Sequence, residues 1–124
     1  MKFRNIAGRG IFGESKVKGK LPMTGKYMAY VGSYSYTGKA KGITVYDVDV
    51  ETGKFIYRCE VEVDNSSYLK ASQNGQILYS IADEGVVAFR VLPNGSLARL
   101  NSANIRGMRG CHLSTSKADD YIFI

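Results

Sequence analysis

Ser-Tyr-Leu-Lys-Ala-Ser-Gln-Asn-Gly-Gln-Ile-Leu-Tyr, residues 67–79, occurs twice in this chain in related form. It returns 44 residues later, at residues 111–123, as Cys-His-Leu-Ser-Thr-Ser-Lys-Ala-Asp-Asp-Tyr-Ile-Phe. A second pair, Gly-Ile-Thr-Val-Tyr-Asp-Val at residues 42–48 and Gly-Val-Val-Ala-Phe-Arg-Val at residues 85–91, is offset by 43 residues. Repeats of about 40–45 residues built from short β-patterned segments are typical of β-propeller blades. One blade is a small sheet that cannot bury both of its faces alone, so the repeat predicts a larger closed ring.

Alternation of apolar and polar residues between turn signals predicts a series of antiparallel strands. The first unit has strands over residues 26–34, 43–50 and 55–63, and the second has strands over residues 67–72, 76–82, 86–91 and 97–104. Asn74-Gly75 and Asn94-Gly95 are turn signals that join strands of the second unit. The second unit is therefore a four-stranded meander, which is the plan of one blade.

These units predict an all-β chain that holds about two blades and the start of a third. Residues 1–22 form a basic extension that we expect to be disordered, and residues 23–64 form a first blade with no counterpart of the strand at 67–72. Residues 67–104 form a complete blade, and residues 111–124 begin the next one. Propellers commonly close their ring when the far end of the chain supplies the strand that the first blade lacks. A ring of roughly four to eight blades needs a longer chain, so we expect these residues to be an N-terminal fragment, inactive alone, whose partners are the C-terminal blades.

The net charge of +6 is concentrated at the N-terminus. Residues 1–22 hold six basic side chains and one acidic side chain, whereas residues 23–124 hold eleven basic and ten acidic side chains. The predicted blades are therefore close to neutral, and they carry no basic groove of the kind that binds nucleic acid.

No stretch of the sequence has the roughly 18 consecutive apolar residues of a membrane span, and no apolar core of a secretory signal is present. The two cysteines, Cys59 and Cys111, fall at opposite ends of their blades and do not form a disulfide framework. We therefore expect a cytoplasmic protein with reduced thiols and no membrane partner.

Two glycine-rich stretches look like nucleotide-binding motifs but lack the necessary context. Residues 8–13 match G-x-G-x-x-G, yet no strand precedes them and Pro22 opposes a following helix. Residues 32–39 resemble a phosphate-binding loop, but Ala40 stands where a hydroxyl group is needed and no helix follows. Neither stretch predicts a nucleotide cofactor.

His112 is the one histidine of the chain, and the repeat aligns it with Tyr68 at the start of an innermost strand. Side chains at that position line the mouth of a propeller's central channel, where ligands commonly bind. Arg106 and Arg109 precede His112 and carry guanidinium groups that suit an anionic group. The alternative is structural: His112 bonds a loop carbonyl and the arginines face water. One histidine and two separated cysteines give no metal site.

Several segments together resemble the propeller-type 6-phosphogluconolactonase (lactonase) family, over about residues 27–124. The resemblance rests on Tyr-Val-Gly-Ser-Tyr at residues 30–34, Glu-Thr-Gly-Lys at 51–54, Asp-Asn-Ser-Ser-Tyr-Leu at 64–69, Asn-Gly-Gln-Ile-Leu-Tyr at 74–79 and Gly-Cys-His-Leu-Ser at 110–114, with the segments at 42–47, 85–90 and 93–95. The chain departs from the family's frequent Ser-Pro-Asp-Gly turn, because it has Ser-Gln-Asn-Gly at 72–75 and Ser-Lys-Ala-Asp at 116–119. Those changes affect a turn and not a site.

The resemblance implies a seven-bladed propeller that hydrolyses 6-phosphogluconolactone to 6-phosphogluconate in the pentose phosphate pathway, without a metal or other cofactor. Its small-molecule partner would be a phosphorylated sugar lactone. On this basis we expect His112 to be the catalytic group of these blades, with Arg109 and Arg106 as contacts to the substrate's anionic group. Two alternatives remain: a non-catalytic propeller that serves as a binding platform, and a relative that forms a muconate lactone. The absence of tryptophan, and so of the Trp-Asp signature of platform repeats, weakens the first.

Overall fold

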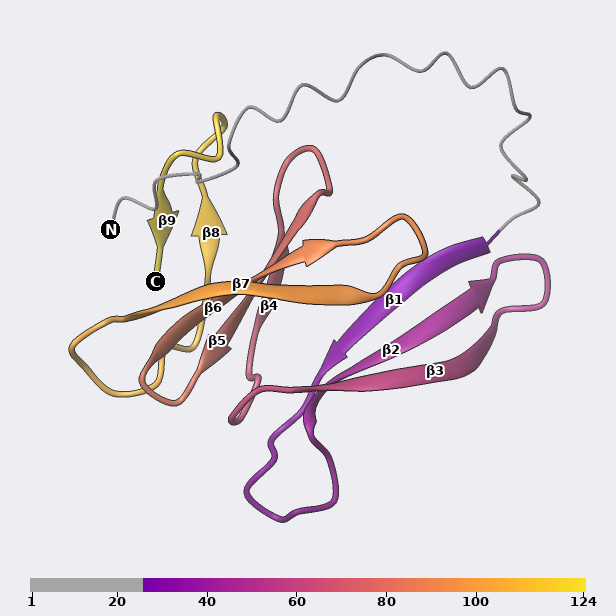
Figure 1. Ribbon diagram of the computed structural model, residues 1–124, viewed down its shortest axis with the longest axis horizontal. Coiled ribbons are helices and arrows are strands. Elements are labelled where there is room, and N and C mark those ends of the chain that lie inside the picture. The colour runs from indigo at the N-terminus through magenta and orange to yellow at the C-terminus, as the bar shows by residue number, and fades with distance from the viewer. Residues whose placement is uncertain (1–25) are drawn as a thin grey trace.

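A computed structural model describes residues 26–124, and within them the chain is all-β, with strands in three antiparallel sheets (Figure 1). The expected disordered extension, residues 1–22, lies outside the described residues. The first sheet contains β1 (Lys26–Gly32), β2 (Gly42–Asp49) and β3 (Lys54–Glu62). The second contains β4 (Leu69–Ala71), β5 (Ile77–Ala82), β6 (Gly85–Val91) and β7 (Leu97–Asn104). β8 (Ser114–Thr115) and β9 (Ile122–Phe123) form the third.

Every sheet is a meander in which consecutive strands are neighbours. The registers preserve the sequence repeat, because Gly42 opens β2 as Gly85 opens β6. β1, β2 and β3 therefore correspond to β5, β6 and β7. Within the described residues no strand of the first sheet corresponds to β4, and β1 is hydrogen-bonded to a strand on one side only.

Strands β5 and β6 of the second sheet are buried on both faces. Alternate residues of β6 point to opposite sides of the sheet, so each face contributes to a different cluster. Val87 and Phe89 join Ile43, Val63 and Leu78 in a cluster between the first and second sheets, which we call the blade 1–2 cluster. Val86 and Ala88 join a second cluster, called the blade 2–3 cluster, against the residues that begin the third sheet. Its buried members are Tyr79, Ile81, Val86, Ala88, Leu113 and Ile122.

Polar contacts also join the first two blades at the end where the chain turns from β6 into β7. The hydroxyl of Tyr30, in β1, donates to the carbonyl oxygen of Gly95 in the β6–β7 turn at 2.8 Å. The guanidinium of Arg58, in β3, donates to the carbonyl oxygen of Asn94 in the same turn and lies 3.6 Å from the carboxylate of Asp47. The turn after β6 is thus docked on the first sheet.

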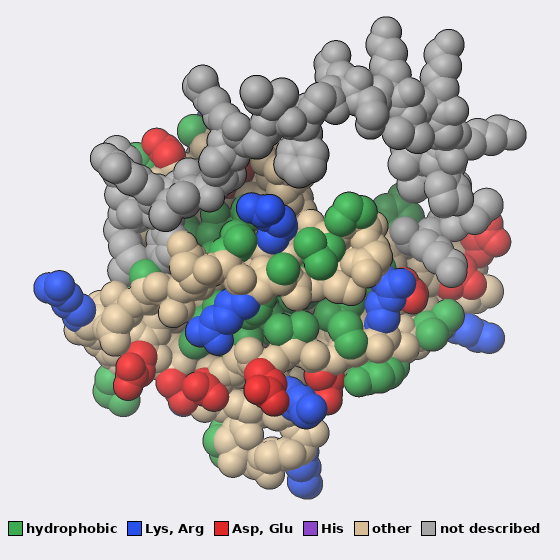
Figure 2. All heavy atoms as spheres, viewed as in Figure 1, with side chains coloured by type: hydrophobic (Ala, Val, Ile, Leu, Met, Phe, Trp, Pro, Cys, Tyr) green, Lys and Arg blue, Asp and Glu red, His purple; other side chains and the backbone are tan. Residues whose placement is uncertain are grey.

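The face of the first sheet that points away from the blade 1–2 cluster presents aromatic side chains to solvent. Tyr27, Phe55 and Tyr57 are 59%, 59% and 60% exposed. The ring of Tyr46 lies between the last two, edge-on at 5.9 Å from Phe55 and 6.4 Å from Tyr57. The repeat pairs Tyr46 with Phe89, which is fully buried in the blade 1–2 cluster. Hydrophobic side chains are also visible among charged groups across the face shown in Figure 2.

The sequence pattern predicts inter-blade packing for the strand tyrosines Tyr30, Tyr46, Tyr57 and Tyr79. Tyr30 and Tyr79 do pack against the two inter-blade clusters. Tyr57 does not, because its face of the first sheet has no neighbouring sheet among the described residues.

Gly42→Ala is expected to lower the free energy of unfolding by about 3 kcal/mol or more. Gly42 has φ +121°, and an added Cβ would lie 2.2 Å from the carbonyl oxygen of Val63, so the end of the β2–β3 pairing would have to open. Gly38→Ala is the matched control. Gly38 also has positive φ, +71°, but an added Cβ meets nothing within 4 Å, and about 1 kcal/mol is expected. Urea unfolding, monitored by circular dichroism, gives the free energy of unfolding of both variants. Equal losses for Gly42→Ala and Gly38→Ala would contradict the steric role assigned to Gly42.

Candidate functional site

The loops at one end of the blades converge on a single cluster of polar side chains. Consecutive strands are antiparallel, so β1, β3, β5 and β7 end where β2, β4, β6 and β8 begin. This end, called the loop end, comprises the β1–β2 loop (33–41), the linker 63–68, the turn 83–84 and the linker 105–113. It forms the lower side of the molecule in Figure 1.

Asp83, in the turn between β5 and β6, accepts hydrogen bonds from both linkers. The Asn65 side-chain amide donates to Oδ1 at 3.0 Å and to Oδ2 at 2.9 Å. The guanidinium of Arg109 donates from Nε to Oδ1 at 2.8 Å, and its Nη2 lies 2.5 Å from the same oxygen. The amide of Asn65 first, and then Arg109, hold the pKa of the Asp83 carboxyl below its ordinary value, although partial burial opposes this shift.

Asn65 anchors the β1–β2 loop as well as Asp83. It is 5% exposed and adopts φ +51°, a left-handed conformation that asparagine tolerates better than most residues. Its Oδ1 accepts from the backbone N–H groups of Ser35 at 2.8 Å and Tyr36 at 3.0 Å. Its own backbone N–H donates to Oγ of Ser35 at 3.0 Å. One buried amide therefore joins the loop, the linker and the turn.

Arg109 is held on a second side by an aromatic ring. Its guanidinium carbon lies 5.4 Å from the ring centroid of Tyr34, which is a cation–π arrangement. Tyr34 in turn contacts Tyr36 edge-on at 5.9 Å between ring centroids. The carboxylate and the ring together fix the orientation of the guanidinium.

His112 lies on the same linker as Arg109 and is exposed. Its ring centroid is 4.8 Å from that of Tyr68. These two residues are equivalent by the repeat, so adjacent blades bring equivalent positions together where their innermost strands begin. A hydrogen bond of 3.3 Å from Oγ of Ser67 to the carbonyl oxygen of Gly110 ties the two linkers beside this contact.

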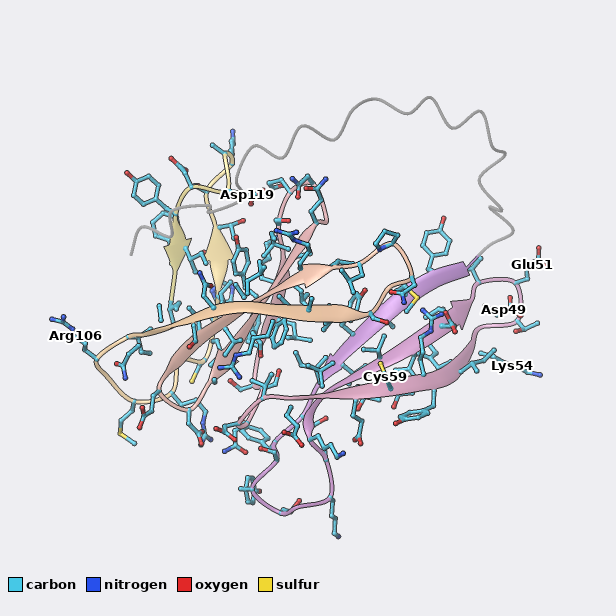
Figure 3. The ribbon with its side chains drawn as sticks, viewed as in Figure 1. Asp49, Glu51, Lys54, Cys59, Arg106 and Asp119 are labelled. Atoms are coloured by element: carbon cyan, nitrogen blue, oxygen red, sulfur yellow. The ribbon has the colours of Figure 1, made fainter. Side chains whose placement is uncertain are left out.

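Arg106 is placed differently from Arg109 and His112. It adopts φ +55°, and its backbone N–H donates to Oδ1 of Asn104 at 2.5 Å. Figure 3 shows its side chain pointing outward from the tip of the loop that follows β7. The structure thus groups His112 and Arg109 with one set of contacts and leaves Arg106 outside that set.

Sequence patterns single out Arg109 and His112 but not Asn65 or Asp83. Asn65 reads as part of a turn and Asp83 as a turn residue between two strands. The signal available in the sequence is that each loop or linker of the loop end contains a polar residue. That signal identifies a site only when the loops and linkers are known to converge in three dimensions.

An open cavity of about 320 Å³ lies beside Asp83. Its lining includes three acidic residues and one arginine, which are Asp64, Asp83, Glu84 and Arg99. Among residues 26–124, no group of histidine, cysteine, aspartate or glutamate side chains is arranged to hold a metal ion. The same residues contain no helix that is long and apolar enough to cross a membrane.

Asp83→Asn is expected to lower the melting temperature near neutral pH, by a few degrees at most because the pair is exposed. A carboxyl group whose pKa is lowered on folding stabilises the folded state above its ordinary pKa of 3.8. This contribution disappears as the pH falls through the lower value of the folded state. The difference in melting temperature between wild type and variant should therefore shrink between about pH 5 and pH 2. A pH-independent difference would contradict the role of the carboxylate charge.

The sequence profile of the family described as "Lactonase, 7-bladed beta-propeller" matches residues 28–124. A 6-phosphogluconolactonase from Formosa agariphila is 29% identical, and the alignment covers 77% of this chain and 29% of that protein. The chain thus spans less than a third of the length of this relative.

Two solved structures resemble the described residues. A candidate 6-phosphogluconolactonase from Bacteroides fragilis superposes with a TM-score of 0.69 and is 30% identical, covering 77% of this chain and 28% of that one. A second, from Bacteroides uniformis, has a TM-score of 0.68 and 24% identity, covers 73% of this chain and 28% of that one, and supports the fold alone.

Proposed function

The chain belongs to the family of seven-bladed β-propeller lactonases, and from that premise we propose that the whole protein is a lactone hydrolase that converts 6-phosphogluconolactone to 6-phosphogluconate. Support comes from the family match over residues 28–124 and from the relative named for this activity. The structural observation that carries the proposal is the pairing of His112 with Tyr68 at the start of adjacent innermost strands, beside the oriented guanidinium of Arg109.

His112 is proposed as a general base in this reaction. It takes a proton from water as the water oxygen attacks the lactone carbonyl carbon, and the bond from that carbon to the ring oxygen then breaks. The proton passes to the departing ring oxygen, which becomes a hydroxyl group. The products are a carboxylic acid, which ionises at neutral pH, and an alcohol.

Arg109 is proposed to hold the substrate's phosphate. Asp83 engages Nε and Nη2, so Nη1 keeps donors that suit a phosphate oxygen. Arg106 is proposed as a second, outer contact, because it is exposed on the same linker. Both arginines would raise the affinity for phosphorylated over unphosphorylated lactones.

We further propose that a blade from elsewhere in the ring covers the first sheet. The free edge of β1 and the exposed face that carries Tyr27, Phe55 and Tyr57 support this. The equivalence of Tyr46 with the buried Phe89 indicates that this face suits the same kind of sheet-on-sheet contact as the blade 1–2 cluster.

The test is an assay of the whole protein with 6-phosphogluconolactone, in which hydrolysis is measured above the spontaneous rate. Catalysis is expected, with a lower KM for this lactone than for unphosphorylated gluconolactone. Turnover should be absent from the isolated 124-residue chain. Binding without turnover by the whole protein would instead favour a binding platform, and lactone formation from a muconate would favour the cyclising relative.

A further inference from the structure

We propose that Asp83 is a positioning residue for the candidate site: its carboxylate holds the linker that carries His112 in the conformation that places the imidazole against Tyr68. The catalytic consequence of this inference rests on the proposed lactone hydrolysis. The structural part, which concerns the position of the His112 ring, stands independently of any activity.

Two linkers of the loop end meet at the Asp83 carboxylate. Asp83 accepts hydrogen bonds from Asn65, on the linker between the first two blades, and from Arg109, on the linker between the second and third. Its carboxylate is therefore a junction between segments that are more than 40 residues apart in the sequence. Without the carboxylate, the side chains of Asn65 and Arg109 share no partner among the contacts of the described residues.

Both partners of the Asp83 carboxylate are themselves held in place. Asn65 is buried and is itself fixed by two backbone N–H groups of the β1–β2 loop. Arg109 approaches Oδ1 with two nitrogens and rests against Tyr34. Charge-assisted bonds with two nitrogens restrict orientation more than a single contact does. Asp83 therefore sits between one rigid amide and one rigid guanidinium.

Arg109 and His112 are two residues apart on one linker. Gly110 and Cys111 are the residues between them, and both belong to a linker without regular secondary structure. Gly110 is held through its carbonyl oxygen by Ser67. The path to His112 is thus fixed at Arg109 by Asp83 and at Gly110 by Ser67. When the Asp83 anchor is removed, Arg109 keeps its contact with the Tyr34 ring, and the linker keeps the 3.3 Å bond between Ser67 and Gly110 and the buried side chain of Leu113, so the imidazole is held less firmly.

The experiment uses the 124-residue chain, in which His112 is the one histidine and gives a single imidazole Hε1 signal in a proton NMR spectrum. Wild type is expected to show a nuclear Overhauser effect between the rings of His112 and Tyr68, and a ring-current shift of the Hε1 signal. Asp83→Ala is expected to weaken the Overhauser effect and move Hε1 toward its random-coil position, while the amide signals of β5 and β6 stay dispersed. Glu84→Ala, an exposed acid on the same turn, is the matched control and should leave both features unchanged.

If the Overhauser effect in Asp83→Ala is as strong as in wild type, the proposal is wrong. If Asp83→Ala fails to fold, Arg109→Gln decides, because it removes the other partner and leaves the bonds between Asn65 and Asp83 in place. A weaker Overhauser effect in folded Arg109→Gln supports the proposal, and an unchanged effect overturns it.

In the whole protein, Asp83→Ala is expected to lower kcat by about tenfold or more, because small displacements of a catalytic group are costly. In a His112→Ala background it should have little further effect on kcat, since both changes remove the same function. An equal loss in both backgrounds would assign Asp83 a merely structural role. If the wild-type protein hydrolyses no lactone, the proposed function fails while the NMR result still tests the position of the ring.

Discussion

Phe89→Ala is expected to lower the free energy of unfolding of the chain by about 3–5 kcal/mol. Phe89 is fully buried and is the largest side chain of the blade 1–2 cluster, where it packs with residues of both sheets. Truncation removes its ring from that contact and leaves a cavity that the two sheets cannot close without separating. Small domains have about 5–15 kcal/mol of stability in total, so the variant should be largely unfolded at moderate temperature.

Phe55→Ala is the matched control for this prediction. It removes the same side chain from a position that is 59% exposed, so a loss of less than about 1 kcal/mol is expected. Because the chain has no tryptophan, urea unfolding is followed by tyrosine fluorescence and circular dichroism. Similar losses for the two variants would show that the sheets do not share the core that the structure assigns to them.

His112→Ala in the whole protein is expected to lower kcat/KM for 6-phosphogluconolactone by about 10²–10⁴, the usual contribution of a general base. In the proposed reaction, removal of the imidazole leaves the attacking water without a proton acceptor at this position. The fold should be retained, because the His112 side chain is exposed and Tyr68, its ring partner, still packs against the blade 2–3 cluster.

Cys111→Ala controls for changes in the linker, since Cys111 is the exposed neighbour of His112 and has no role in the proposed reaction. Its kcat/KM should match that of wild type. An unchanged kcat/KM for His112→Ala would remove the residue from the mechanism. A change in KM alone would assign it to substrate binding and not to proton transfer.

The sequence predicts the architecture well because the deciding signals are local. Alternation along residues 85–91 determines which side chains face each neighbouring blade, and Asn-Gly turns mark where the chain reverses. The repeat then predicts the strand order. The largest boundary differences, two residues each, are at the end of β1, which stops at Gly32, and at the start of the innermost strand, where β4 covers only Leu69–Ala71. There Ser66 bonds with Ser80 and Ser67 with Gly110, so their side chains tie neighbouring segments together beside the strand.

The site is harder to predict because it depends on segments that meet only in three dimensions. The left-handed conformation of Asn65 and its bonds to Ser35, Tyr36 and Asp83 follow from the convergence of three loops. No local sequence pattern predicts that convergence. The same limit applies to Arg109. The sequence around it suggests an unpaired cation, whereas in the structure it contacts Asp83 and Tyr34.

The central claim is that these sheets are successive blades around one axis and that His112 faces that axis. The most direct measurement is a crystal structure of the whole protein. We expect a strand to be paired with the free edge of β1, a sheet to cover Phe55 and Tyr57, and His112 to line the central channel. A structure in which β1 keeps an open edge, or in which His112 lies on the outer rim, would contradict the claim.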